Sequence, residues 1–175
     1  MNKLQFKNIS ENLDQYEGQI ELLLNSLTSE KEFFITFDKK VIMRADLVIA
    51  AFDGQTMIGI TGFEKKYFLH KSFSMVRKDY QKLGVGAFLF LRRIEEARKR
   101  YDIILNMVNP QNTLSIQMTE TQGGKYLGKR YDHVYLMLPL NKKGFFIFYL
   151  LKIGFPILIL WDIFESGWQK IKTAN

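Results

Sequence analysis

The chain has 175 residues, of which 47% are hydrophobic and 25% charged, so it is long enough for one folded domain and too apolar for wholesale disorder. It contains no cysteine, which excludes disulfide frameworks, thiol nucleophiles and cysteine-ligated metals, and its two histidines argue against a multi-histidine metal site. We therefore expect no metal. Residues 1–7 lack the apolar stretch of a signal peptide, and we expect a cytoplasmic protein.

The net charge of +7 is concentrated in the middle of the chain. Residues 65–100 contain 11 lysines and arginines against three acidic residues, so the other residues sum to a charge of −1. Such a local surplus indicates an anionic partner bound at this segment more than general adhesion to nucleic acid, which we do not expect. A solvated helix face around Arg92, Arg93 and residues 98–100 is the alternative, and it would account for about half of the surplus.

The first 66 residues predict helices beside a β-hairpin. In chain order the pattern predicts a strand, a helix, an irregular second helix and two further strands, at residues 3–9, 10–24, 29–44, 47–52 and 57–64. Asp53-Gly54 is a strong hairpin signal between the last two strands. Ser10 or Asn12 would cap the first helix, and Lys65-Lys66 is predicted as a turn.

The following residues predict strands that alternate with helices. In chain order these are a strand, a long helix, a strand, a short helix and a strand, at residues 67–76, 84–97, 101–108, 113–121 and 131–140. Residues 101–108 are largely apolar, as expected of a strand covered on both faces. Gly123-Gly124 would end the short helix. The whole pattern predicts an α/β fold of the α+β type, a mixed sheet with helices packed on it.

A glycine-containing turn joins the strand at 67–76 to the long helix. Gly84 and Gly86 remove side chains where a backbone must approach a ligand closely, and the N–H groups of the helix start favour an anion. Lys78 and Lys82 would add positive charge. Glycines that serve packing alone are the alternative, and a bare Gly-x-Gly favours neither interpretation.

The residues around these glycines resemble a known family. Residues 81–86 read Gln-Lys-Leu-Gly-Val-Gly and match the Gln/Arg-x-x-Gly-x-Gly/Ala signature of the GNAT superfamily of N-acetyltransferases. Val76, five residues before Gln81, and Tyr80, directly before it, are also as that family usually has them. A weaker similarity follows at residues 103–116, and the resemblance covers about residues 3–140.

The resemblance implies a mostly antiparallel sheet, splayed between its fourth and fifth strands, with acetyl-coenzyme A in the gap. It implies that the backbone of Ser74, Met75 and Val76 pairs with the pantetheine arm. It further implies that the pyrophosphate is held by the N–H groups of Gln81, Lys82, Leu83, Gly84, Val85 and Gly86. The implied reaction moves an acetyl or other acyl group to a primary amine of unknown identity, aided by a base and an acid.

Two residues are candidates for the base of this reaction, Glu64 and His70, which lie on adjacent predicted strands. Histidine suits proton removal near neutral pH because its ordinary pKa is about 6.5. A structural strand histidine is the alternative for His70, and a turn charge is the alternative for Glu64.

The sequence differs from the family's pattern at the residue expected to act as the general acid. The family often has a tyrosine where this chain has Thr119, and a Gly-Phe pair where this chain has Gly123-Gly124. Tyr126 is a substitute acid, or a packed aromatic at the start of a strand. Asn112 would bind the ligand or an ordered water, or cap a helix. These departures keep open a second function, a non-catalytic acyl-CoA-binding or membrane-associated module with the same fold.

Residues 141–175 follow the predicted acyl-CoA-binding domain at 1–140 and form an apolar, helical tail. Residues 145–161 are an apolar run of 17, interrupted by Lys152, Gly154 and Pro156, which makes a poor spanning helix. Two interpretations of residues 144–172 stay open. The tail lies on a membrane surface, which would place the protein at the inner membrane face, or it covers a sheet face or a homodimer interface.

Overall fold

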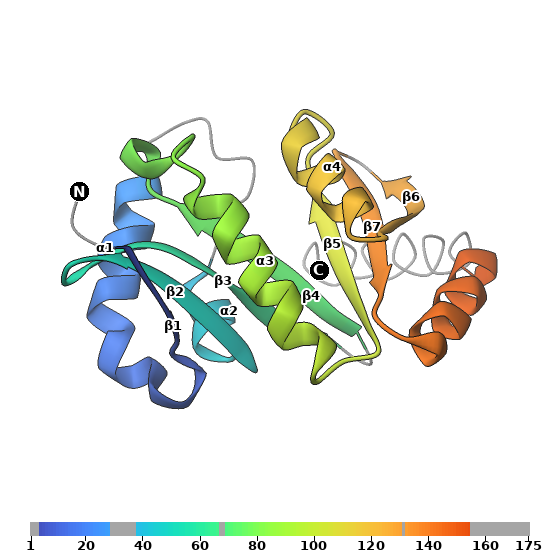
Figure 1. Cartoon of the computed structure of the whole chain (residues 1–175), viewed down its shortest axis with the longest axis horizontal. Coiled ribbons are helices and arrows are strands. Elements are labelled where there is room, and N and C mark those ends of the chain that lie inside the picture. The colour runs from blue at the N-terminus through green and yellow to red at the C-terminus, as the bar shows by residue number, and fades with distance from the viewer. Residues whose placement is uncertain (1–3, 29–37, 67–68, 131, 155–175) are drawn as a thin grey trace, which may run out of the picture.

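A seven-stranded sheet with helices on both faces forms the protein in the computed structural model, which describes residues 4–28, 38–66, 69–130 and 132–154 (Figure 1). The strands, in chain order, are β1 Leu4–Asn8, β2 Leu47–Asp53, β3 Thr56–Lys66, β4 Leu69–Val76, β5 Ile103–Val108, β6 Lys125–Arg130 and β7 His133–Pro139. Their order in the sheet is β1-β2-β3-β4-β5-β7-β6, and β4–β5 is the parallel pair in an otherwise antiparallel sheet. The predicted mixed, mostly antiparallel sheet is confirmed.

The helices lie between these strands as the sequence order requires. In chain order they are the 3-10 helix η1 Ser10–Tyr16, α1 Glu17–Thr28, α2 Lys39–Met43, the 3-10 helix η2 Lys78–Tyr80, α3 Val85–Arg98 and α4 Thr113–Thr121. Residues 142–154 are also helical and are called the C-terminal helix below.

Two apolar layers cover the two faces of the sheet at strands β2, β3 and β4. Ile20 and Leu23 of α1 belong to one layer, and Leu89 and Ile94 of α3 belong to the other. Alternate residues of β2 face these two layers, because side chains along a strand point to opposite faces. Burial on both faces explains why β2 is apolar from Leu47–Asp53 except at its last residue.

The strands β4 and β5 pair at one end and separate at the other. His70 pairs with Ile104 and Lys71 with Leu105, and the two strands share no further register pair in the described residues. On either side of this break, β3 stays paired with β4 as far as Val76, and β7 stays paired with β5. Figure 1 shows the resulting gap, which widens away from these paired residues. Ser74 is exposed although its strand lies in the middle of the sheet, as an open gap requires.

Several predicted boundaries were wrong. Lys65 and Lys66 lie in β3 and pair with β4, so they form no turn, and the Lys65 side chain is exposed near the end of the sheet. The edge strand β6 was missed because its polar sequence contains a glycine and a register shift, which hide the alternation. The last strand begins at His133 and not at residue 131.

The predicted helices at the start of the chain also need correction. Residues 10–16 form a 3-10 helix preceded by Ile9, with non-helical backbone at Asn12, so neither Ser10 nor Asn12 caps the predicted helix. Of the irregular helix predicted at 29–44, the short helix α2 is seen, and residues 29–37 lie outside the described residues. The predicted helix at 113–121 is confirmed with the same bounds.

The C-terminal helix is fastened to the sheet at Asp102. The Asp102 carboxylate accepts a hydrogen bond from Asn141 Nδ2 at 2.8 Å and lies 2.7 Å from Lys143 Nζ. These two partners lower the pKa of Asp102 below its ordinary value. Further along the helix, Phe148 is buried against Ile103 and its neighbours.

The opposite side of the C-terminal helix is exposed and apolar. Its exposed large hydrophobic residues are Phe145, Phe146, Tyr149, Leu150 and Ile153. No helix within the described residues is long and apolar enough to cross a membrane. Residues 155–175 of the predicted tail lie outside the described residues.

Replacing Gly144 should loosen this helix. An alanine Cβ at position 144 would lie 1.9 Å from the Asp102 carbonyl oxygen, so the helix would have to move. We expect Gly144→Ala to lower the free energy of unfolding by about 1–3 kcal/mol, measured by thermal or urea unfolding. Gly154→Ala is the matched control on the same helix, because a Cβ there meets nothing within 4 Å. Equal stability of the two variants would contradict this close approach.

Candidate functional site

Buried polar side chains gather where β4 and β5 separate. Four polar or charged residues are almost fully buried among those that the structure describes, and they are Thr61, Arg93, Asn106 and Thr119. They come from β3, α3, β5 and α4. Thr61 and Arg93 donate to the Phe73 carbonyl of β4, and Asn106 joins Thr119 to Ser72 of β4. Because a buried polar group costs free energy unless it is paired, their concentration at one point of the sheet favours a functional site over packing.

A chain of hydrogen bonds crosses from β4 to β5 and α4. The Ser72 hydroxyl donates to Asn106 Oδ1, and Asn106 Nδ2 donates to Thr119 Oγ1 at 3.1 Å. The Thr119 hydroxyl then donates to the Ser115 carbonyl at 2.8 Å. This chain begins one residue beyond the last β4–β5 pair, so it bridges the two half-sheets at the closed end of the gap.

On the edge of β4 that pairs with β3, the side chain of Arg93 contacts the strand from α3. Its Nη1 donates to the Thr61 hydroxyl and to the Phe73 carbonyl, both at 3.0 Å, and Thr61 donates to the same carbonyl at 2.8 Å. The guanidinium also lies 5.3 Å and 5.2 Å from the ring centres of Phe63 and Phe90. Burial lowers the pKa of Arg93 to about 9.

The backbone of β4 presents alternate residues to the gap. Arg77 N–H donates to the Ile58 carbonyl at 2.9 Å, just beyond the pair Val76 and Gly59. Hydrogen-bonded pairs alternate along an antiparallel ladder, so Met75 and Phe73 direct their N–H and C=O groups to β3. Ser74 and Val76 therefore direct theirs to the gap, and Ser72 directs its groups toward β5 at the closed end. Of the three predicted pantetheine contacts, Met75 is directed to β3 and its side chain is buried.

The turn between β4 and α3 has unusual backbone geometry. Gly84 lies before the helix with φ +81°, and Lys82 takes φ +66°, a left-handed conformation that is uncommon for a residue with a side chain. The first turn of α3 carries no acidic residue and no side-chain cap, so its free N–H groups and the helix dipole favour an anion.

The predicted ligands in this turn differ in what they can offer. Gln81 donates from Nε2 to the Val76 carbonyl at 3.0 Å, which ties the turn to the end of β4. Lys82 and Leu83 are exposed, whereas the Val85 side chain is buried in the core. A Cβ at Gly86 would approach the Val76 side chain to 3.8 Å, so the start of the helix lies beside the end of the strand.

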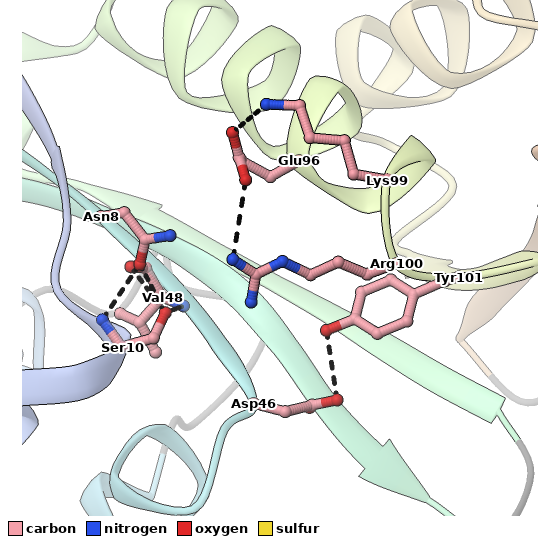
Figure 2. A network of polar contacts seen from close by, with 8 residues as sticks. All are labelled: Asn8, Ser10, Asp46, Val48, Glu96, Lys99, Arg100 and Tyr101. Carbon is pink, nitrogen blue, oxygen red and sulfur yellow. Dashed lines mark hydrogen bonds and ion pairs between the residues drawn. The ribbon is translucent and has the colours of Figure 1, made fainter.

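The two candidate bases lie on adjacent strands, as predicted, but on opposite faces of the sheet. Glu64 pairs with Lys71, and His70 pairs with Lys65. His70 Nδ1 is 3.1 Å from Asp46 Oδ2, and its ring stacks on Tyr101 at 3.8 Å. Figure 2 shows the Tyr101 hydroxyl, which donates to Asp46 at 3.1 Å. His70 thus lies in a cluster with Asp46 and Tyr101 at the closed end of the gap.

The other two candidates lie away from the buried polar cluster. Tyr126 is half exposed in β6 and pairs with Leu136, which pairs with Asn106. Two strand spacings separate Tyr126 from Asn106, about 10 Å. Asn112 caps α4, because its Oδ1 accepts a hydrogen bond from Ser115 N–H at 3.1 Å.

Ser72 and Asn106 were not among the predicted site residues, and the solvated helix face considered for Arg93 is wrong, because Arg93 is buried. A signal was present for two of them: Arg93 lies one turn from both Leu89 and Ala97 on the buried side of α3, and Asn106 interrupts an apolar strand. A single polar residue on an apolar face is uninformative until its neighbours in space are known.

Comparison with known proteins places this arrangement in a structural class. No protein-family model and no curated protein matches the sequence, but solved structures do. The acetyltransferase of GNAT family from Streptococcus pneumoniae is 16% identical, and the match covers 77% of this chain and 97% of that chain with a TM-score of 0.60.

Two further structures were solved with a ligand. The structure of yncA from Salmonella typhimurium contains its cofactor acetyl-CoA; it is 15% identical, with 81% of this chain and 96% of that chain covered and a TM-score of 0.63. The paia N-acetyltransferase from Thermoplasma acidophilum, in complex with coenzyme A, is 14% identical, with 78% and 99% covered and a TM-score of 0.60. The chain has the GNAT fold.

Thr119→Val should destabilise the protein through the buried chain. The valine removes the acceptor of Asn106 Nδ2 and leaves a buried amide unpaired, which costs about 1–3 kcal/mol. Thr121→Val is the matched control: Thr121 is exposed on the same helix, and its hydroxyl also donates to a carbonyl one turn back. We expect it to change the free energy of unfolding by less than about 0.5 kcal/mol. If urea unfolding finds the two variants equally stable, the hydrogen bond from Asn106 to Thr119 does not contribute as described.

Proposed function

We propose that the protein is an acyltransferase that moves an acetyl or related acyl group from coenzyme A to a primary amine. The observation that carries the proposal is the gap between β4 and β5, which ends at a helix start with free N–H groups. Such a gap suits a ligand with an extended amide arm and a pyrophosphate. The ligands of yncA and of the paia N-acetyltransferase, acetyl-CoA and coenzyme A, support this choice.

The residues on both sides of the gap fit acetyl-CoA. Ser74 and Val76 offer N–H and C=O groups along one open strand edge, to which an extended pantetheine arm can add as a strand does. The pyrophosphate would lie at the first N–H groups of α3, where Lys78 and Lys82 add positive charge. The left-handed backbone at Gly84 turns the chain into the helix at this point.

The chemistry needs one base. The amine nitrogen attacks the thioester carbonyl, a C–N bond forms, the C–S bond breaks, the amine's proton passes to the base, and the thiolate of coenzyme A leaves and is protonated by water. We assign the base to Glu64, which is half-buried. Glu64 pairs with Lys71 of β4, and Lys71 pairs with Leu105 of β5 at the point where these two strands separate. His70 lies beside Asp46 and stacks on Tyr101, and we assign no step to it or to Tyr126.

A second candidate function is acyl-CoA binding without catalysis. It is favoured by the burial of Thr119, whose hydroxyl donates to the Ser115 carbonyl in the place where a tyrosine acid would meet the ligand. This alternative retains the site in the gap and loses turnover.

We also propose that the exposed apolar side of the C-terminal helix is covered in the functioning protein. Phe146, Tyr149 and Ile153 are more than half exposed there, and a contiguous apolar surface of this kind is uncommon on a free monomer. A second copy of the chain and a membrane surface are the two candidates, and sedimentation analysis with and without anionic vesicles separates them.

Gly86→Glu should abolish binding of acetyl-CoA. The substitution puts a carboxylate at the start of α3, where it repels the phosphates and fills their space. Titration calorimetry should find micromolar binding to the wild type and at least about 100-fold weaker binding to the variant. Gly18→Glu is the control, because a Cβ at this helical position meets nothing within 4 Å. Wild-type affinity of Gly86→Glu would contradict the proposed phosphate site.

Glu64→Gln should slow the reaction without weakening acetyl-CoA binding. Loss of a general base lowers kcat by about 100- to 10,000-fold, and the amide keeps the size of the side chain. His70→Gln should have a smaller effect, since His70 faces the other side of the sheet. The measurement is steady-state turnover on a panel of primary amines. A larger loss in His70→Gln would move the assignment to His70, and binding without turnover in the wild type would favour the second function.

A further inference from the structure

Arg93 is a buried cation without a carboxylate partner. Its side chain is 4% exposed, and no ion pair joins it to an acidic residue within the described part of the chain. Its neighbours are two phenylalanine rings, the Thr61 hydroxyl and the Phe73 carbonyl, and its Nε has no hydrogen-bond partner. An apolar side chain of similar length would fill this place between Phe63 and Phe90 at lower cost.

The carbonyl that Arg93 contacts belongs to the peptide whose N–H faces the gap. Phe73 directs its C=O toward β3, where it accepts from Arg93 and from Thr61. The peptide between Phe73 and Ser74 is trans, so its N–H points the opposite way from its C=O. The Ser74 N–H is therefore directed into the gap between β4 and β5.

Hydrogen bonds at one end of a peptide strengthen the group at the other end. A carbonyl that accepts from a cation is polarised more than one that accepts from a neutral donor, and in a buried site water does not screen the effect. Two side chains donate to the Phe73 carbonyl, and one of them is charged. Polarisation of this carbonyl strengthens the Ser74 N–H as a donor, because both groups belong to one peptide.

We propose that Arg93 and Thr61 are positioning residues that, through the peptide between Phe73 and Ser74, make the Ser74 N–H a strong donor to the carbonyl oxygen of an acyl thioester. That oxygen gains negative charge when the amine attacks, and a donor fixed in advance stabilises the charge. The inference rests on the proposed acyl transfer. It also explains the retention of a buried cation in a site where Thr119 is occupied by other contacts.

Arg93→Met tests the role in catalysis. Methionine fits between the two rings and removes the charge, so the melting temperature should stay equal to that of the wild type or rise. The affinity for acetyl-CoA should stay within about threefold, whereas kcat should fall by roughly 10- to 100-fold, less than for loss of a direct donor. Arg92→Met is the matched control: Arg92 is 61% exposed on the same helix and pairs with Glu95, so both values should match the wild type. An unchanged kcat in Arg93→Met overturns the inference.

A second measurement is independent of turnover. The amide proton of Ser74, assigned by NMR in the free protein, should move upfield in Arg93→Met and stay in place in Arg92→Met. Arg93→Gln, which retains an N–H donor without the charge, should give an intermediate shift and serves if the methionine variant fails to fold. A Ser74 resonance that is the same in all variants overturns the inference. Absence of turnover together with the expected shift would instead reject the proposed function and leave the polarised peptide in place.

Discussion

The central constraint of this fold is that β4 is paired along the whole of one edge and along two residues of the other. It pairs with β3 from Leu69 to Val76, and the short parallel contact at His70 and Lys71 fixes where β5 departs from it. Among the described residues, the N–H and C=O groups of Ser74 and Val76 on that edge then have no strand partner, and a strand edge in the middle of a sheet is a strong template for an extended ligand.

Both halves of the molecule contribute to keeping this break open without weakening the protein. A hydrogen-bond chain of Ser72, Asn106 and Thr119 connects the half-sheets at the closed end. On the side of β4 that faces β3, Arg93 donates a hydrogen bond to the Phe73 carbonyl. At the open end, Gln81 ties the turn before α3 to the Val76 carbonyl. The buried polar groups are therefore arranged around one strand, which is the strand that an acyl-CoA would contact. A core of apolar residues at the same positions would be more stable but would offer no such support.

The sequence predicted the parts of this arrangement that depend on local patterns. Apolar runs located β2, β5 and α3, and Gly84 and Gly86, between an apolar strand and a helical pattern, located the turn. The edge strand β6 was missed since it is polar and bulged, and Lys65 and Lys66 were assigned to a turn from their charge alone. Arg93 and Asn106 could not be read as site residues, because their meaning comes from contacts between α3, β4, β5 and α4 that no spacing in the chain encodes.

The most direct test of this account is an amide NMR titration of the protein with acetyl-CoA. If the gap between β4 and β5 is the acyl-CoA site, the largest shifts will fall on Ser72, Ser74 and Val76 and on residues 82–87, with small shifts in β1 and β2, which are remote from the gap. Absence of shifts at saturating ligand, or shifts confined to another face of the molecule, would contradict it.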